Sequence, residues 1–135
     1  MNILLVDDEE IIRKSLGDFL SKTGHTVFTA ADEEAALDLL RRKNIDVGIF
    51  DFAIKDKDGI KLLCQAKLIN PDAKYIIITG VGSMWNAAES FHCGAFSFIK
   101  KPLDLTNLLS TLNKIKRSKD INTAVERIRT DRLEG

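Results

Sequence analysis

Short apolar segments alternate five times with longer amphipathic segments along this chain of 135 residues. The apolar segments lie at about 3–6, 26–30, 47–50, 75–78 and 95–99, and they are rich in β-branched and aromatic residues. Such segments are typical of parallel strands that are covered on both faces. Because parallel strands need crossover helices, the alternation predicts an α/β fold: a doubly wound (βα)5 three-layer sandwich around a five-stranded parallel sheet.

The amphipathic segments carry apolar residues at helical spacing, which predicts helices that bury one face. Asp32 and Asp104 are suited to cap two of these helices at the N-terminus. Gly24, Pro71 and Gly94 are suited to end others. The apolar stripes are Ile11, Ile12, Leu16, Phe19 and Leu20, then Ala35, Ala36, Leu39 and Leu40, then Ile60, Leu63, Cys64 and Leu68, and finally Leu105, Leu108, Leu109, Leu112 and Ile115. A further helix is expected from about Ser83 to Cys93.

Two local features modify this scheme. Residues 52–58 are expected to form a loop, closed by the turn-forming pair Asp58 and Gly59. Gly48 lies inside an apolar strand, where glycine indicates a close approach of neighbouring groups.

The C-terminal stretch differs in composition. From Arg117 to Gly135 the chain is highly charged, and its only helical stripe is Ile121, Ala124, Val125 and Ile128. That stripe covers about two heptads, fewer than a coiled coil requires. We therefore predict one domain at 1–117 and a helical extension or linker stub at 118–135, although simple fraying fits this stretch equally well. Glu134 and Gly135 could be left over from cloning, so they are excluded from the fold prediction.

Composition narrows the function. Twenty basic residues balance twenty acidic ones, which argues against a nucleic-acid or membrane-surface binder driven by charge. No apolar run approaches the ~20 residues needed to span a bilayer, and a strand pattern begins at the N-terminus where a signal peptide would stand. We expect a cytoplasmic protein. Cys64 and Cys93 form neither a CxxC pair nor a disulfide framework, so we expect two free core thiols.

Acidic residues follow two of the apolar segments. Asp7, Asp8 and Glu9 come after the first, and Asp51 comes after the third. If the two strands are neighbours, Asp7, Asp8 and Asp51 converge at the carboxyl edge of the sheet, where such folds bind ligands. Two unit charges about 5 Å apart repel by roughly 3 kcal/mol at an effective dielectric near 20. The cluster therefore favours a hard cation, and oxygen ligands suit Mg²⁺ or Mn²⁺.

Two further strand ends add a hydroxyl and an ammonium group. Thr79 and Gly80 follow the fourth apolar segment, and Lys100, Lys101 and Pro102 follow the fifth. A metal site, a nucleophilic carboxylate, a hydroxyl and a lysine at one edge form a set that binds and transfers phosphoryl groups.

The series Asp-Asp, Asp, Thr and Lys-Pro, each at a strand end, resembles the receiver domain of two-component response regulators over Met1 to about Lys116. Four motifs in order are far more specific than any one of them. The resemblance implies a flavodoxin-like strand order, 2-1-3-4-5. It also implies that Asp51 is the phosphoacceptor, taking a phosphoryl group from a phosphohistidine of a sensor histidine kinase or a histidine phosphotransfer protein.

The resemblance also assigns the metal ligands. Asp8, Asp51 and the backbone carbonyl of Ala53 would hold Mg²⁺ (with Mn²⁺ as a possible substitute), and Asp7 would act mostly through a water. Glu9 is interpreted as a helix cap and not as a ligand, since acidic groups favour a helix N-terminus.

Phosphoryl binding and switching fall to the other strand ends. Lys101 would pair with a phosphoryl oxygen, and the resemblance implies a cis peptide before Pro102. Lys100 would point away, because side chains alternate along a strand. Thr79 would move toward the phosphoryl group, with Gly80 leaving room. Phe98 occupies the position of the family's switch aromatic, although permanent burial is an equal alternative.

Two positions resemble those that tune dephosphorylation, and here they are Ala53 and Val81. Neither side chain can orient a water, so we expect a long-lived phosphorylated form. In the loop after Asp51 the chain has Ile54 and Lys55 where the family commonly has Met-Pro. Whether Lys55 weakens metal binding or assists phosphate binding stays open.

These features predict a signalling switch that acts on itself, and not an enzyme with a separate substrate. A pseudo-receiver that works only through protein contacts is the main alternative. A haloacid-dehalogenase-type phosphatase fits poorly. That family carries the motif Asp-x-Asp after its first strand, whereas this chain has Asp7-Asp8-Glu9 there and its expected nucleophile on a later strand. Expected partners are the phosphohistidine donor, an output domain after the C-terminus, and a second copy bound through the helix at 83–93, the strand at 95–99 and the helix from 105. A stand-alone regulator, a phosphorelay intermediate and a part of a longer protein all remain open.

Overall fold

A computed structural model describes residues 1–54, 57–80 and 91–134 of the chain. The chain forms two compact units, Met1–Leu103 and Asp104–Gly135. The first unit contains the sheet and the predicted site residues that the structure describes.

The first unit is built on a five-stranded parallel sheet. Its strands are β1 (Asn2–Val6), β2 (Thr26–Ala30), β3 (Val47–Asp51), β6 (Lys74–Thr79) and β7 (Ser97–Lys100). They lie in the order β2-β1-β3-β6-β7, and every neighbouring pair is parallel. Counted along the chain, this is the order 2-1-3-4-5, so the predicted topology is confirmed.

The segment predicted as a loop at 52–58 contains two more strands. β4 (Ala53–Ile54) and β5 (Lys57–Asp58) pair with each other in an antiparallel ladder. The expectation of a plain loop is therefore wrong. Strands of two residues are too short to show a periodic pattern in a sequence.

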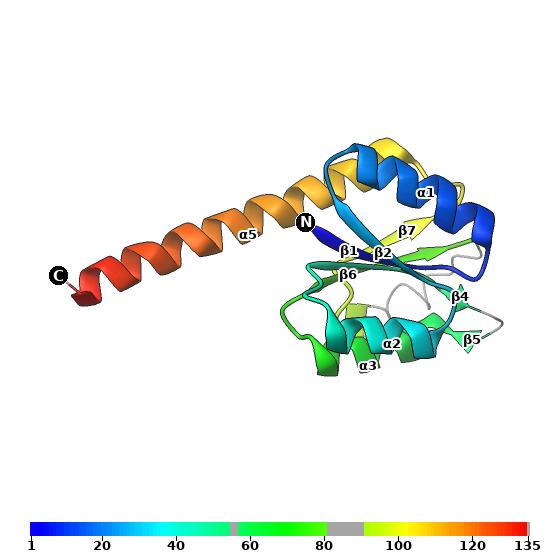
Figure 1. The fold of residues 1–135 in the computed structure, drawn as a ribbon, viewed down its shortest axis with the longest axis horizontal. Helices are drawn as coiled ribbons and strands as arrows, with labels where there is room; N and C mark the ends of the chain where they lie inside the picture. The colour runs from blue at the N-terminus through cyan, green and yellow to red at the C-terminus, as the bar shows by residue number, and fades with distance from the viewer. Residues whose placement is uncertain (55–56, 81–90, 135) are drawn as a thin grey trace. The chain divides into compact units, whose positions relative to one another are not determined.

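Helices cover both faces of the sheet. Figure 1 shows α1 (Glu10–Lys22) on one face and α2 (Glu33–Arg42) beside α3 (Gly59–Ile69) on the other. Strand β3 is buried along its whole length because it lies between these layers. The carboxylate of Asp32 accepts a hydrogen bond from the amide of Ala35 at 2.8 Å, as expected of an N-cap. These layers confirm the predicted three-layer sandwich.

Most residues of the predicted helical stripes are at least partly buried, but four are exposed: Ala35, Leu105 and, most prominently among the large side chains, Ile11 and Leu68. Ile11 is 80% exposed on α1 and Leu68 is 85% exposed on α3. Each residue in a helix is rotated by about 100° from the one before it. Leu68 therefore lies far around α3 from the buried Ala66, and Ile11 lies off the line that joins Leu16 and Leu20. Both were wrongly placed in the core.

The helix predicted at 83–93 falls largely outside the described residues. Its last part is described: residues 91–92 are helical, and the amide of Gly94 donates to the carbonyl of Phe91 at 3.0 Å. Gly94 has φ +98°, a conformation that favours glycine and ends a helix as predicted.

The two cysteines are joined in the structure. Cys64 on α3 and Cys93, four residues before β7, form a disulfide, and their Cα atoms are 5.5 Å apart. The prediction of two free thiols is therefore wrong. Because the cysteines are 29 residues apart in sequence, only the packing of α3 beside the chain that leads into β7 brings them together.

The second unit is one long helix, α5 (Leu105–Glu134). The Asp104 side chain accepts hydrogen bonds from the amides of Thr106 and Asn107 at 2.9 and 3.3 Å, so the predicted cap is confirmed. Leu108, Leu112 and Ile115 are buried, whereas Ile121, Val125 and Ile128 are exposed. The helix passes through residue 117 without a break, and a domain boundary at that position stays a prediction.

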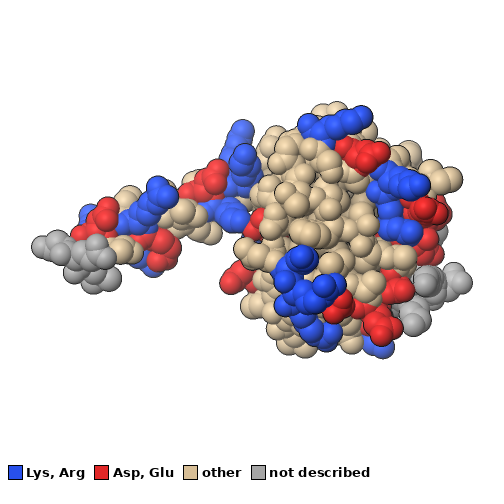
Figure 2. Space-filling view, viewed as in Figure 1, with Lys and Arg blue, Asp and Glu red and all other residues tan. Residues whose placement is uncertain are grey.

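Charged side chains of both signs are interspersed on the visible surface (Figure 2). This distribution agrees with the equal numbers of basic and acidic residues in the sequence. Among the described residues, no helix combines the length and apolar character needed to cross a membrane.

Candidate functional site

Four neighbouring strands bring the predicted site residues to one edge of the sheet. Asp51 and Thr79 are the last residues of β3 and β6, Asp7 and Asp8 follow β1, and Lys101 follows β7. The strands are parallel and paired nearly to their ends, with Val6 beside Phe50, Asp51 beside Ile78 and Thr79 beside Lys100. The convergence expected from the strand ends is present.

Three carboxylates form the centre of the site. Asp7, Asp8 and Asp51 each offer one oxygen, and these atoms all lie within 4.8 Å of one another. Asp7 and Asp51 are only 4% and 9% exposed, whereas Asp8 is open to solvent. Oxygen ligands on two buried and one exposed side chain suit a hard divalent cation that keeps some of its waters.

The electrostatics of Asp7 point the same way. Burial raises the pKa of the Asp7 carboxyl above its ordinary value, and the charges of Asp51 and Asp8 raise it further. A hydrogen bond from the Glu9 amide and the charge of Lys101 oppose this shift without reversing it. The negative cluster is thus held together at a cost that a bound cation would reduce.

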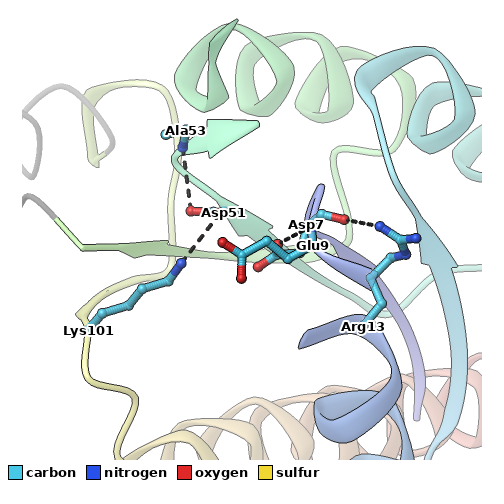
Figure 3. A network of polar contacts seen from close by, with 6 residues as sticks. All are labelled: Asp7, Glu9, Arg13, Asp51, Ala53 and Lys101. Atoms are coloured by element: carbon cyan, nitrogen blue, oxygen red, sulfur yellow. Dashed lines mark hydrogen bonds and ion pairs between the residues drawn. The ribbon is translucent and has the colours of Figure 1, made fainter. Parts of the chain in front are cut away.

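Hydrogen bonds fix the turn that carries Asp7 (Figure 3). The Asp7 carboxylate accepts from the amide of Glu9 at 2.9 Å, and the guanidinium of Arg13 donates to the Asp7 carbonyl at 2.8 Å. Glu9 stands at the N-cap of α1, but its side chain makes no capping hydrogen bond. Glu9 therefore occupies the cap position as interpreted, but its side chain does not cap the helix. The amide of Glu9 instead donates a hydrogen bond to the Asp7 carboxylate.

Lys101 faces the carboxylate of Asp51 (Figure 3). Its Nζ lies 3.5 Å from one oxygen of Asp51, and the amide of Ala53 lies 3.4 Å from the other. Both contacts are long for hydrogen bonds, so neither holds the carboxylate tightly. Lys101 lies toward the site as expected, and its bond to Pro102 is cis. Lys100 is exposed at the end of β7, one position away.

Thr79 and Phe98 lie on the strands next to Lys101. Thr79 is 2% exposed, and its carbonyl accepts a hydrogen bond from the amide of Lys101 at 2.7 Å. Phe98 is half-buried and packs against the main core cluster. This partial burial is intermediate between a mobile switch aromatic and a permanently buried side chain, the two alternatives for Phe98.

The expected role of Gly80, leaving room for Thr79 to move, stays a prediction. A Cβ atom there would meet Lys101 Cδ at 3.6 Å, an ordinary contact. Packing in this structure therefore does not require glycine at position 80. Val81 and Lys55 lie outside the described residues.

Gly59 is a residue that sequence reasoning missed. A Cβ atom there would lie 2.6 Å from the Asp51 carbonyl oxygen and 2.7 Å from that of Phe52. The Gly59 amide donates to the Phe52 carbonyl at 2.6 Å. The first residue of α3 therefore packs directly on the backbone that carries Asp51, and a side chain there would disturb it. The Asp58-Gly59 pair indicated only a turn, because the contact of Gly59 with the Asp51 backbone joins residues eight positions apart and has no sequence pattern.

Comparison with known proteins agrees with this geometry. The model of the response regulator receiver domain family matches residues 3–113. The chain belongs to this family. The receiver domain is 33% identical over 112 residues to sporulation initiation phosphotransferase F of Bacillus subtilis, a match that covers 83% of this chain and 90% of that protein.

Solved structures are similar throughout the receiver domain. A CheY-like receiver domain protein from Methanospirillum hungatei has a TM-score of 0.83 and 30% identity, with 88% of this chain and 96% of that chain covered. A response regulator from Burkholderia pseudomallei, solved with a phosphorylated aspartic acid, a calcium ion and citrate, has a TM-score of 0.79 and 25% identity, with 93% and 74% covered.

Other relatives are much longer. The match to the transcriptional regulatory protein GlrR of Escherichia coli, 33% identical over 112 residues, covers 83% of this chain but 25% of that protein. The receiver domain thus corresponds to about a quarter of such a relative.

Proposed function

We propose that this receiver domain accepts a phosphoryl group on Asp51 from a phosphohistidine donor, in a reaction that depends on Mg²⁺. The observation that carries the proposal is the meeting of three carboxylates within 4.8 Å, with the ammonium of Lys101 3.5 Å from Asp51. Nucleophile, cation ligands and a counter-charge for phosphoryl oxygens then lie at one sheet edge.

In the proposed transfer, a carboxylate oxygen of Asp51 attacks the phosphorus atom in line. The new O–P bond forms as the N–P bond of the phosphohistidine breaks, and the imidazole leaves with the electron pair of that bond. The long contacts from Lys101 and Ala53 support Asp51 as the nucleophile. Each lies near one carboxylate oxygen without forming a short hydrogen bond to it.

Asp8, Asp51 and the Ala53 carbonyl would hold Mg²⁺ directly, and Asp7 would hold it through water. When bound, the ion supplies positive charge that offsets the carboxylates and the phosphoryl oxygens. The buried carboxylates of Asp7 and Asp51 and the raised pKa of Asp7 favour a cation here. Mn²⁺ has similar ligand preferences and should substitute.

Lys101 and Thr79 would stabilise the phosphorylated Asp51, and their movement would begin the conformational change. Phosphorylation adds about −1.5 to −2 charges, which Lys101 would pair with and the Thr79 hydroxyl would hydrogen-bond. The hydrogen bond from the Lys101 amide to the Thr79 carbonyl joins the two strand ends and supports a coupled movement of Thr79 and Lys101. Phe98 packs on the core from β7, so it is suited to follow that movement.

The proposed readout is a change of the surface that includes β7, residues 81–93 and α5. Ala53 is exposed beside Asp51 and carries no group that could orient an attacking water. With Val81 as the second tuning position, slow loss of the phosphoryl group is the expected behaviour. The domain then acts as a switch and not as an enzyme that turns over a separate substrate.

The N-terminal end of α1 lies close in sequence to the turn that carries Asp7 and Asp8. Ile11 is 80% exposed there, directly after the turn that carries Asp7 and Asp8. We infer that a sensor histidine kinase or histidine phosphotransfer protein covers Ile11 when it delivers its phosphoryl group. An output domain joined beyond α5 and a homodimer are further proposals, and the longer relatives favour the first of them.

The test is intact-mass spectrometry after incubation with acetyl phosphate and Mg²⁺. The parent should gain one phosphoryl group, and Asp51→Ala should gain none. Omission of Mg²⁺, or Asp8→Asn, should reduce the gain strongly while circular dichroism shows an unchanged fold. No gain by a folded parent with Mg²⁺ would favour a pseudo-receiver, an alternative that the complete set of site residues argues against. The haloacid-dehalogenase alternative has no support, because the chain belongs to the receiver family.

A further inference from the structure

We propose that Cys64 and Cys93 are a reversible redox site, at which exchange with small-molecule disulfides of the glutathione type restrains the chain leading into β7. The site is separate from the carboxylate cluster. Cys64 lies on α3, and Cys93 lies in residues 91–96, which we call the β7 lead-in.

The geometry is suited to a disulfide that forms and breaks. The two Cα atoms are 5.5 Å apart, within the usual range of about 4.4–6.8 Å. Both cysteines are half-buried, so neither residue is fully enclosed by the core. A buried pair would exclude a small thiol or disulfide, and a fully exposed pair would have no packing to keep the sulfurs close in the reduced state.

The Lys67 side chain packs beside the residue that follows Cys93. If Gly94 carried a Cβ atom, it would lie 3.2 Å from Lys67 Cε, so the Lys67 side chain covers the residue next to Cys93. Lys67 also follows Cys64 on α3 by three positions, which places the two on the same side of the helix. The Lys67 ammonium group itself donates to the Pro71 carbonyl at 3.0 Å, so the stem of this side chain packs on the segment while its charge is directed to Pro71. The nucleophile in thiol–disulfide exchange is the thiolate of a cysteine of the pair.

The chemistry is balanced. A thiolate of the pair attacks the disulfide RSSR, forming a protein–SR mixed disulfide and releasing one RS⁻. The second cysteine then attacks the mixed disulfide as its thiolate, forming the Cys64–Cys93 bond and releasing the second RS⁻. The two protons of the protein thiols end on the two RSH molecules. The protein loses two electrons and RSSR gains them, and an excess of RSH reverses both steps.

The bond would restrain the β7 lead-in because few other described contacts hold that segment. Its backbone is tied to β6 by a hydrogen bond from the Phe96 amide to the Tyr75 carbonyl at 2.7 Å. Cys93 and Ala95 also pack against the main core cluster. A covalent link to α3 adds a fixed point just before β7, the strand that carries Phe98 and leads directly to Lys101.

The first experiment equilibrates the full chain with mixtures of oxidised and reduced glutathione. Exchange is then quenched with acid, and the free thiols are alkylated with N-ethylmaleimide in denaturant near neutral pH and counted by intact mass. We expect the doubly trapped form to be replaced by an untrapped disulfide form as the oxidised fraction rises, and to return when the mixture is reversed. Cys64→Ser and Cys93→Ser should instead yield single mixed disulfides with glutathione. Absence of the internal disulfide at every ratio, or failure to reverse, would overturn the proposal.

The second experiment measures amide hydrogen exchange in the oxidised and reduced chain. Exchange in residues 91–101 should be slower in the oxidised form by at least about threefold, while α1 serves as an internal reference that should not change. Cys64→Ser treated with the same reagents should show no such difference. Equal exchange of residues 91–101 in both redox forms would refute the restraint.

A consequence for phosphorylation rests on the proposed function. Because β7 leads to Lys101, the oxidised and reduced forms should be phosphorylated by acetyl phosphate at different rates. Equal, measurable rates would overturn this coupling. No phosphorylation of either form would count against the proposed function instead, and the glutathione and exchange experiments would still decide the redox proposal.

Discussion

Replacing Gly48 by alanine should destabilise the domain, although the added group is only a methyl. A Cβ atom at this position would lie 2.6 Å from Tyr75 Cδ1 and 2.8 Å from Phe50 Cε1. Carbon atoms in contact are normally about 3.5–4.0 Å apart, so one ring or the strand must move. The sequence marks Gly48 only as an unusual strand residue, whereas the structure identifies the two rings that require it.

Neither ring can move easily. Phe50 and Tyr75 are both fully buried, and their centroids are 5.4 Å apart. The Tyr75 hydroxyl lies 3.0 Å from the Ala66 carbonyl and 2.8 Å from that of Asn70, so a shift of its ring weakens a buried hydrogen bond. Over-packing a core costs about 1–3 kcal/mol, and we expect the upper half of that range here. The lower entropy of the unfolded alanine chain returns about 0.4–1 kcal/mol, which leaves a net loss of about 2 kcal/mol.

Gly17→Ala is the matched control. A Cβ atom at Gly17 would meet Thr29 Cγ2 and Val27 Cγ1 at 3.9 Å, which is ordinary contact, and Gly17 lies inside α1. Alanine there should stabilise the domain by about 0.5–1 kcal/mol. Urea unfolding followed by circular dichroism, with both variants in the same redox state, measures the two free energies. A Gly48→Ala variant as stable as the parent would refute the reasoning, whereas both variants moving together would show a general effect of alanine.

Three further predictions concern the site and the disulfide. Gly59→Ala should lower the stability by about 1–3 kcal/mol and slow phosphorylation by acetyl phosphate, because its Cβ atom would overlap the Asp51 carbonyl oxygen at 2.6 Å; an unchanged rate on intact-mass time courses would contradict the contact. Asp7→Asn without Mg²⁺ should stabilise the domain near pH 7 in urea unfolding. The raised pKa means that the folded Asp7 binds a proton more readily than the unfolded one, so the parent loses stability as pH rises from the unfolded pKa through the folded pKa. The advantage of Asp7→Asn should therefore shrink below that window, and its persistence at low pH would argue against burial as the cause. Reducing the Cys64–Cys93 bond, which closes a loop over 29 positions, should lower the unfolding free energy by about 3–4 kcal/mol, with Cys64→Ser insensitive to reductant.

The site residues could be predicted because their positions follow from local pattern and one topological rule. Asp7, Asp51, Thr79 and Lys101 each end an apolar run, and parallel strands bring such ends to one edge. The burial of Asp7 and the direction of its pKa shift could not be predicted, since they depend on how closely the β1–α1 turn folds back. The roles of these four residues stay predictions, as do those of Asp8, Phe98 and Val81.

Contacts between distant segments were the features that sequence reasoning missed. The disulfide and the contact of Gly59 with the Asp51 backbone each join residues whose spacing carries no local signal. The exposure of Ile11 and Leu68 was missed for a different reason. At about 100° per residue, Ile11 and Leu68 lie on the far side of their helices from the buried residues, so an apolar side chain in a helical segment need not belong to its buried stripe.

Because α5 is unbroken, the rotation about its axis would set the orientation of any domain attached to its end. In a helix of 30 residues, the direction of the last turn is fixed by the direction of the turn that Asp104 caps. Each residue inserted between them turns the far end by about 100° and advances it by about 1.5 Å. A protein fused after Glu134 would therefore change its facing with every inserted residue. It would return close to its original facing, within about 20°, after seven insertions, about 10 Å farther along the helix axis.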